Sequence, residues 1–230
     1  MLFRKKNREI KYEKPKIKVS IYGDSISTYE GYSNTIDTDN AVFYPIKGMC
    51  KDLNDTWWMR MIIDNNFELV VNNSSSGCYV KGKGNCTGSN FDEGVGKRIN
   101  HLSKEDIIPE LIFVYMGIND LNSLKTSDQF KEDYDEMLSK LTTLYPTSKL
   151  VTLNLQKTTN DDKSELREEY NNYIEELSTK YNTVLVELSK MKISGKEYVN
   201  YSSDNLHPNV LGMSCIAGTI TKTLKDKKII

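Results

Sequence analysis

The sequence contains no long hydrophobic run. No segment approaches the ~20 consecutive apolar residues that cross a bilayer, and residues 1–16 have no apolar stretch of the length found in secretion signals. Those residues instead carry seven basic and two acidic side chains. We therefore expect residues 1–16 to form a solvated basic tail, and we predict no stable membrane insertion and a cytoplasmic location.

A strong excess of charge of either sign is also missing. The chain has 31 lysine and arginine residues against 32 aspartate and glutamate residues, a formal net charge of -1. Proteins that bind nucleic acid need a basic face to contact phosphates. The balance of charge therefore argues against nucleic acid as a partner and favours a small-molecule substrate. It does not predict an oligomeric state.

Cysteines are few and irregularly spaced. The four are Cys50, Cys78, Cys86 and Cys215, and none forms a C-x-x-C pair. We therefore predict no metal site and no cofactor. Cys215 lies among small and apolar residues of a helical segment and is expected to be buried. Cys78 and Cys86 flank a glycine-rich loop and could pair in an oxidising compartment, but without a secretion signal we expect reduced thiols.

At 230 residues the chain is long enough for one domain with its own core, which we place at residues 17–230. Short apolar segments, each of strand length, alternate with helical patterns along it. The expected strands are 17–22, 67–72, 111–116, 149–155 and 183–188. The expected helices are 56–63, a short one at 97–104, 128–145, 166–181, and a last one starting at Pro208. This alternation predicts an α/β fold, a flavodoxin-like three-layer α/β/α sandwich around a five-stranded parallel sheet.

Polar loops follow the first three predicted strands. They are Gly23-Asp24-Ser25, Ser74-Ser75-Ser76-Gly77 and Gly117-Ile118-Asn119-Asp120. Parallel strands bring their carboxyl ends to one edge of a sheet, where ligands and reacting groups collect. Ser25 is therefore either a nucleophile or part of a polar ligand cradle.

The chain has only two histidines, His101 and His207. His101 lies in a charged helix end and is best interpreted as a surface or capping residue. His207 follows Asp204 by three residues, close enough for the carboxylate to orient the imidazole. Pro208 is expected to be the first helical residue, which would hold His207 just outside a helix N-terminus.

These segments make the chain resemble the SGNH, or GDSL-type, hydrolase family. Gly23-Asp24-Ser25 resembles its nucleophile block, residues 72–77 its second block, residues 117–120 its third and residues 204–208 its last, all in family order. The resemblance extends over residues 17–224. The predicted domain is thus similar to an SGNH hydrolase domain.

The resemblance implies a role for each motif residue. Ser25 would be the nucleophile, His207 its general base and acid, and Asp204 the residue that orients His207. The oxyanion hole would consist of the Ser25 and Gly77 backbone N–H groups and the Asn119 side-chain amide.

The structural roles of four further residues in these blocks can also be predicted. Asp24 and Asp120 are expected to stabilise their turns by hydrogen bonding. Ser74 and Asn205 stand where glycine is common in the family. Asn tolerates a positive φ, so the change at Asn205 is mild, whereas Ser74 is expected to alter the loop path near Gly77.

The substrate is less well defined by the sequence. Six aromatic residues come from or lie beside the long loop after the first strand: Tyr29, Tyr32, Phe43, Tyr44, Trp57 and Trp58. Of these, Trp57, Tyr29 and Tyr44 are the predicted substrate contacts. The sequence shows no broad apolar lid, which favours short acyl or O-acetyl esters, with esters on a carbohydrate among the candidates.

Other functions stay open at this point. A lysophospholipase or thioesterase of the same family and a non-catalytic carbohydrate-binding relative are the alternatives. A flavodoxin-like cofactor protein would share the architecture, but Asp24 would place a negative charge in its anion cradle, which is unfavourable.

Overall fold

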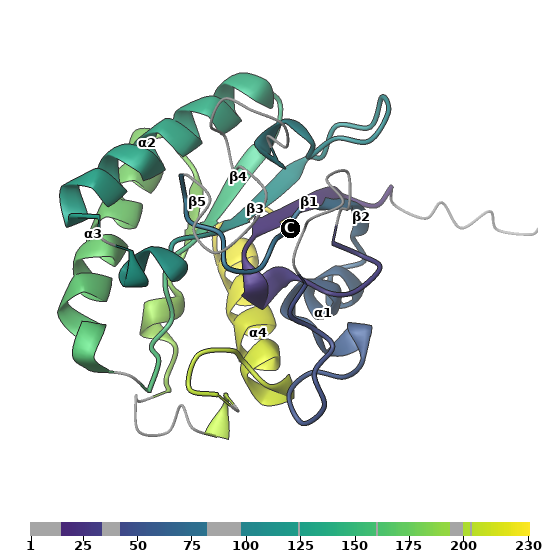
Figure 1. Ribbon diagram of the computed structural model, residues 1–230. Coiled ribbons are helices and arrows are strands. Elements are labelled where there is room, and N and C mark those ends of the chain that lie inside the picture. The colour runs from purple at the N-terminus through teal and green to yellow at the C-terminus, as the bar shows by residue number, and fades with distance from the viewer. Residues whose placement is uncertain are drawn as a thin grey trace, which may run out of the picture.

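The computed structural model describes residues 15–33, 42–81, 98–123, 125–159, 161–193, 200–202 and 204–230 (Figure 1). Of the predicted basic tail, only residues 15 and 16 are among them, and Cys86 lies outside the described residues.

A parallel sheet forms the centre of the described chain. Its strands are β1 (Lys18–Gly23), β2 (Glu68–Asn72), β3 (Leu111–Tyr115), β4 (Lys149–Leu153) and β5 (Val184–Val186), in the order β2-β1-β3-β4-β5. Every neighbouring pair is parallel. The five-stranded parallel sheet expected from the sequence is thus confirmed, and the order reverses direction at β1, where ligands bind in open α/β sheets.

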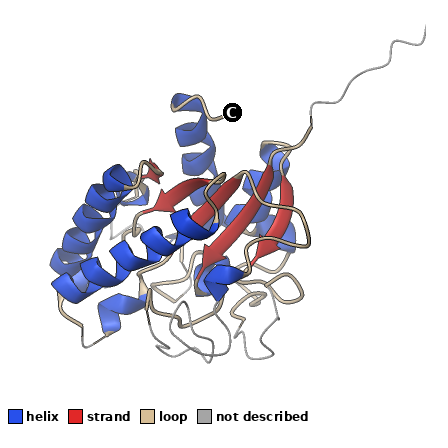
Figure 2. Cartoon of the chain, turned by 90° about the horizontal axis from the view of Figure 1, so that it is seen from above, coloured by secondary structure: helices blue, strands red, loops and turns tan. Residues whose placement is uncertain are grey.

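Helices cover both faces of the sheet. They are α1 (Trp57–Asp64), α2 (Ser127–Leu144), α3 (Ser164–Lys180) and α4 (Val210–Asp226). Helices α2 and α3 pack against each other on one face, and α1 packs against α4 on the other (Figure 1). Seen from above, the strands run side by side between these two helical layers (Figure 2). The fold is therefore the predicted three-layer sandwich.

Two helix predictions need correction. Within the described part of the expected helix 97–104, which starts at Arg98, the only helical turn is the 3-10 helix Arg98–Asn100. Helix α4 begins at Val210 rather than at Pro208, because the Asn209 side chain caps it by accepting hydrogen bonds from the N–H groups of residues 211 and 212. Asparagine is among the strongest N-cap residues, so Pro208 is left outside the helix.

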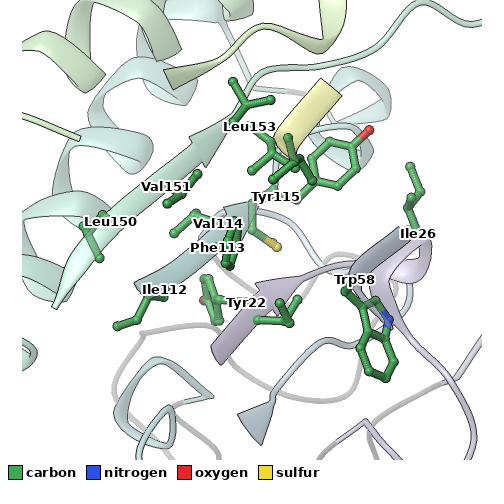
Figure 3. Packing of buried hydrophobic residues seen from close by; sticks show 14 of the residues in the cluster. Tyr22, Ile26, Trp58, Ile112, Phe113, Val114, Tyr115, Leu150, Val151 and Leu153 are labelled. Atoms are coloured by element: carbon green, nitrogen blue, oxygen red, sulfur yellow. The ribbon is translucent and has the colours of Figure 1, made fainter. Parts of the chain in front are cut away.

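The core is densest around β3. Its five residues are all buried, as expected for a strand covered on both faces. Figure 3 shows Phe113, Val114 and Tyr115 beside side chains of β1 and β4. The Trp57 ring, at the start of α1, contacts Phe113 and Tyr115, with centroids 6.3 and 6.2 Å apart. Burying one large apolar side chain contributes roughly 1.5–3 kcal/mol. The core thereby fixes the strand ends from which the polar loops emerge.

Gly23, the last residue of β1, is required by space rather than by backbone angle. A Cβ at this position would lie 2.5 Å from Ser27 Oγ and 3.1 Å from Ser74 Oγ. The absence of a side chain lets the turn after β1 fold back against the loop after β2. The two loops pack closely because of this glycine.

We predict that Gly23→Ala lowers the free energy of unfolding by about 1–3 kcal/mol, the usual cost of overpacking. Gly218→Ala is the matched control, because Gly218 lies inside α4 with no heavy atom within 4 Å of the added Cβ. That change should raise stability by about 0.5–1 kcal/mol, since glycine weakens helix interiors. Urea denaturation of both variants measures the difference, and equal effects of the two would contradict this packing argument.

Candidate active site

Ser25 lies in a tight turn at the end of β1. It begins a 3-10 helix, Ser25–Ser27, that Asp24 caps by accepting a 3.0 Å hydrogen bond from the Ile26 N–H. Asp24 thus stabilises the turn, as expected. Burial raises the pKa of Asp24 to about 7 against the opposing effect of this hydrogen bond. Only 2% of the Ser25 surface is exposed.

Hydrogen bonds join Ser25, His207 and Asp204 in one chain. His207 Nε2 lies 2.8 Å from Ser25 Oγ, and His207 Nδ1 lies 2.7 Å from Asp204 Oδ2. Asp204 Oδ1 also accepts from the backbone N–H groups of Leu206, at 3.0 Å, and His207, at 2.7 Å. With the proton on Nδ1 donated to Asp204, Nε2 is free to accept the serine hydroxyl proton.

The protonation states of His207 and Asp204 suit a general base at His207. Burial lowers the pKa of His207, with Asp204 acting in the opposite direction. Burial acts to raise the pKa of Asp204, but the hydrogen bonds from His207 and Leu206 outweigh it, and the pKa is lowered. Asp204 is therefore an anion and His207 a neutral imidazole at neutral pH.

The predicted oxyanion donors lie on the next two loops. Gly77 has a φ of 76°, which glycine adopts at no steric cost. Asn119 begins a 3-10 helix after β3, and its Nδ2 donates a 3.1 Å hydrogen bond to the Cys78 carbonyl. An amide nitrogen carries two hydrogens, so a second N–H remains for a ligand. Asp120, expected to stabilise this loop, accepts from the Val80 N–H at 3.0 Å.

The loop after β2 is tied to the serine turn. Asn72 Nδ2 donates to the Ser27 carbonyl at 2.8 Å, and the Ser75 N–H donates to the Gly23 carbonyl at 3.2 Å. The Ser74 hydroxyl donates to Asn72 Oδ1 at 2.7 Å, which gives this departure from the family pattern a local partner. Asn205 has a φ of 71°, the conformation that asparagine tolerates.

Arg98 supports the same two loops and was missed by the sequence analysis. Its side chain is buried, and Nη1 donates to the Gly23 and Asn73 carbonyls at 3.1 and 2.5 Å. Its guanidinium carbon lies 4.9 Å from the centre of the Tyr22 ring. An arginine in a charged segment normally indicates a surface position, so the sequence carried no signal for this role.

Two of the three predicted substrate contacts are buried. Trp57 is 0% exposed, and its indole Nε1 donates to Ser27 Oγ at 3.3 Å. Tyr44 is 1% exposed and donates to the Pro208 carbonyl at 2.7 Å. Both side chains thus support the site from within and have no exposed surface for a substrate. Tyr29 is partly exposed, and its hydroxyl donates to the Lys51 carbonyl.

Phe43, named above without a role, contacts His207 directly. The two rings are stacked, with centroids 3.5 Å apart and planes 14° from parallel. The loop position of Phe43 and its lack of periodic pattern gave no indication of this contact.

The cysteines differ from the prediction. Cys78 is disulfide-bonded, whereas Cys50 and Cys215 are free, and Cys215 is only partly buried. The expectation of a reduced Cys78, which rested on the lack of a secretion signal, is therefore wrong. The cytoplasmic location stays a prediction. Among the described residues, no helix is long and apolar enough to cross a membrane.

A cavity of about 460 Å³ adjoins Asp204, the carboxylate of the hydrogen-bonded triad. Its lining includes Asp204, Leu206 and Ile118, together with polar residues such as Thr158 and Lys163. A larger cavity of about 1020 Å³ lies along β5, α3 and α4 and contains none of the residues discussed above. Size alone would favour the larger cavity, but chemistry favours the one beside Asp204.

Comparison with known proteins gives the arrangement a family. The profile of the GDSL-like lipase/acylhydrolase family matches residues 17–224. Among curated proteins, none matches the chain significantly.

Several solved structures share the fold. A protein described as a GDSL-like lipase from Bacteroides ovatus is 25% identical, with a TM-score of 0.67 over 93% of this chain and 100% of that one. A second from Bacteroides uniformis is also 25% identical, with a TM-score of 0.68 over 92% and 96% of the two chains. The psychrotrophic esterase EstA from Pseudoalteromonas, in a structure inhibited by monoethylphosphonate, is 15% identical, with a TM-score of 0.62 over 93% and 99%.

The family match covers all five strands of the described sheet and all four polar blocks. The chain therefore belongs to the GDSL-like lipase/acylhydrolase family and is an ester hydrolase of the GDSL type.

Proposed function

We propose that the chain hydrolyses short acyl esters, including O-acetyl groups on a carbohydrate, through an acyl-enzyme on Ser25. The observation that carries this proposal is the hydrogen-bond chain from Asp204 through His207 to Ser25 Oγ. The proposed catalytic domain is residues 17–230, with the basic tail outside it.

The first half of the proposed reaction forms the acyl-enzyme. Ser25 Oγ attacks the ester carbonyl carbon while His207 Nε2 takes the hydroxyl proton, and the carbonyl π electrons move to the oxygen. Asp204 stabilises the imidazolium that forms. Collapse of the tetrahedral intermediate breaks the bond to the alcohol oxygen, which leaves with the proton from His207.

The second half releases the acid. A water molecule attacks the acyl carbon while His207 again takes a proton, and collapse expels Ser25 Oγ, which recovers that proton. In both halves the negative oxygen would be stabilised by the Ser25 and Gly77 N–H groups and by the Asn119 amide. Removing one donor of this kind typically costs about 10²–10³ in kcat.

The lining of the adjoining cavity supports a small, polar substrate. Ligand sites usually have volumes of roughly 300–1,000 Å³, and the cavity beside Asp204 has about 460 Å³. Its lining includes Asp204 but neither Ser25 nor His207, so it could receive only a part of the substrate away from the reacting carbonyl. Lys163, Thr158 and Thr159 contribute polar groups to it, which suit a hydroxylated alcohol part better than a long acyl chain. Lysophospholipase or thioesterase activity remains the alternative and is separated from the proposal by a substrate panel.

We predict that Ser25→Ala and His207→Ala each lower kcat for p-nitrophenyl acetate by about 10⁴-fold, because each removes an indispensable member of the hydrogen-bond chain. His101→Ala, the matched control, should keep wild-type activity. Circular dichroism checks that the variants are folded. Wild-type rates should fall as the acyl chain of the p-nitrophenyl ester lengthens, and acetylated sugars should be cleaved.

Turnover that persists in a folded Ser25→Ala variant would remove this residue from the mechanism. Faster hydrolysis of long acyl esters or acyl thioesters would favour the alternative activities. A folded wild type that cleaves none of these compounds would favour a non-catalytic carbohydrate-binding protein.

The pH dependence follows from His207. The base is active when neutral, so kcat/KM should rise with pH as His207 loses its proton, and the lowered pKa places the midpoint below the ordinary value near 6.5. Asp204→Asn removes the charge that acts to raise this pKa. We therefore predict that this variant shifts the midpoint to still lower pH and lowers the plateau. A midpoint above the ordinary histidine pKa, or an unmoved midpoint in Asp204→Asn, would refute this assignment.

A further inference from the structure

Phe43 and Tyr44 both contact the His207 imidazole. Phe43 lies flat on the imidazole, with ring centroids 3.5 Å apart. Tyr44 meets Phe43 edge to face at 4.9 Å and approaches His207 at 6.4 Å with planes 83° apart. The three rings form one aromatic cluster around the base of the proposed reaction.

Hydrogen bonds also connect Phe43 and Tyr44 to the two segments that carry Ser25 and His207. The Phe43 N–H donates to Thr28 Oγ1, and Thr28 Oγ1 donates to the Ser25 carbonyl, both at 2.9 Å. The Tyr44 hydroxyl donates to the Pro208 carbonyl at 2.7 Å. Two adjacent residues thus connect the serine turn to the histidine loop.

The geometry of His207 shows why such a connection matters. Its two ring nitrogens are hydrogen-bonded to Asp204 and Ser25, and ring nitrogens donate and accept in the plane of the imidazole. Hydrogen bonds at opposite edges leave the ring able to rock about the line that joins them. A flat partner on one face opposes this motion. His207 also lies in a loop, since α4 starts only at Val210. The backbone after it is held by a β-bridge between Ser202 and Pro208 and by the Tyr44 hydroxyl on the Pro208 carbonyl.

We propose that Phe43 and Tyr44 are positioning residues for the reaction: Phe43 fixes the tilt of the imidazole, and Tyr44 fixes the backbone beside it at Pro208. The inference rests on the proposed function, because it assigns these residues to the His207 base. Catalytic groups must be held within about 0.5 Å and 10–20° of the productive geometry. A displacement of about 1 Å can cost roughly 10²-fold in rate.

The decisive variants keep the apolar volume but change one contact. Phe43→Leu removes the flat face, Phe43→Tyr retains it, and Tyr44→Phe removes only the hydroxyl that holds Pro208. Tyr181→Leu is the control. Tyr181 is a partly buried aromatic residue at the C-terminal end of α3 and belongs to none of the loops of the site. For each variant we would measure kcat, KM and the thermal midpoint with p-nitrophenyl acetate.

We expect Phe43→Leu to lower kcat about 10- to 100-fold with little change in KM, and Phe43→Tyr to restore most of it. Tyr44→Phe should lower kcat several-fold. Tyr181→Leu should lower the thermal midpoint as much as Phe43→Leu does while kcat stays at the wild-type value. This contrast separates positioning from a general loss of stability.

Nuclear magnetic resonance of histidine-labelled protein measures the stacking of Phe43 on the His207 ring independently of activity. The chain has only two histidines, so His101 serves as an internal reference. The His207 ring protons should be shifted upfield by the stacked ring, and this shift should disappear in Phe43→Leu and persist in Phe43→Tyr.

Three results would overturn the proposal. Two would refute only the positioning role, and the third would refute the proposed function as well. Wild-type kcat in both Phe43→Leu and Tyr44→Phe would show that the contacts are packing only, as would a drop in kcat that Phe43→Tyr does not restore. A wild type with shifted His207 protons but no turnover on any ester would refute the proposed function itself, and the positioning role with it.

Discussion

The hydrogen bond between Ser25 Oγ and His207 Nε2 is the constraint around which the site is built, and it joins residues 182 positions apart. One such bond contributes only about 0.5–1.5 kcal/mol to stability. It cannot hold the two segments together, so the fold must hold them for it. The buried β3 core fixes the end of β1, while packing of α4 against α1 fixes the segment that carries His207.

The carboxyl groups near the site have pKa values shifted in opposite directions. Burial raises the pKa values of Asp24 and Asp120 to about 7 each, so both are substantially protonated near neutral pH. Asp204 is partly exposed, and hydrogen bonds from His207 and Leu206 keep it ionised in spite of burial. In the proposed reaction the full negative charge thus lies beside His207, where it would stabilise an imidazolium. Charge beside the serine turn, where it would oppose a developing oxyanion, is reduced.

Much of the fold and the central site could be predicted from the sequence, because both depend on local patterns. Alternating strands and helices define the sheet, and parallel strands bring Gly23-Asp24-Ser25 and the loops that follow β2 and β3 to one edge. The positions of Phe43 and Arg98 could not be predicted, since each depends on contacts between loops that have no periodicity. Trp57 begins α1, and its burial follows from the packing of that helix on the sheet, where its ring meets Phe113 and Tyr115.

The central claim is that Ser25 is a nucleophile activated by His207. Intact-mass analysis after treatment with a fluorophosphonate tests it most directly, because the reagent reports an activated serine without knowledge of the substrate. The account predicts a single adduct that maps to Ser25 by peptide analysis and is lost in both Ser25→Ala and His207→Ala. An adduct on another residue, or none on a folded wild-type protein, would contradict it.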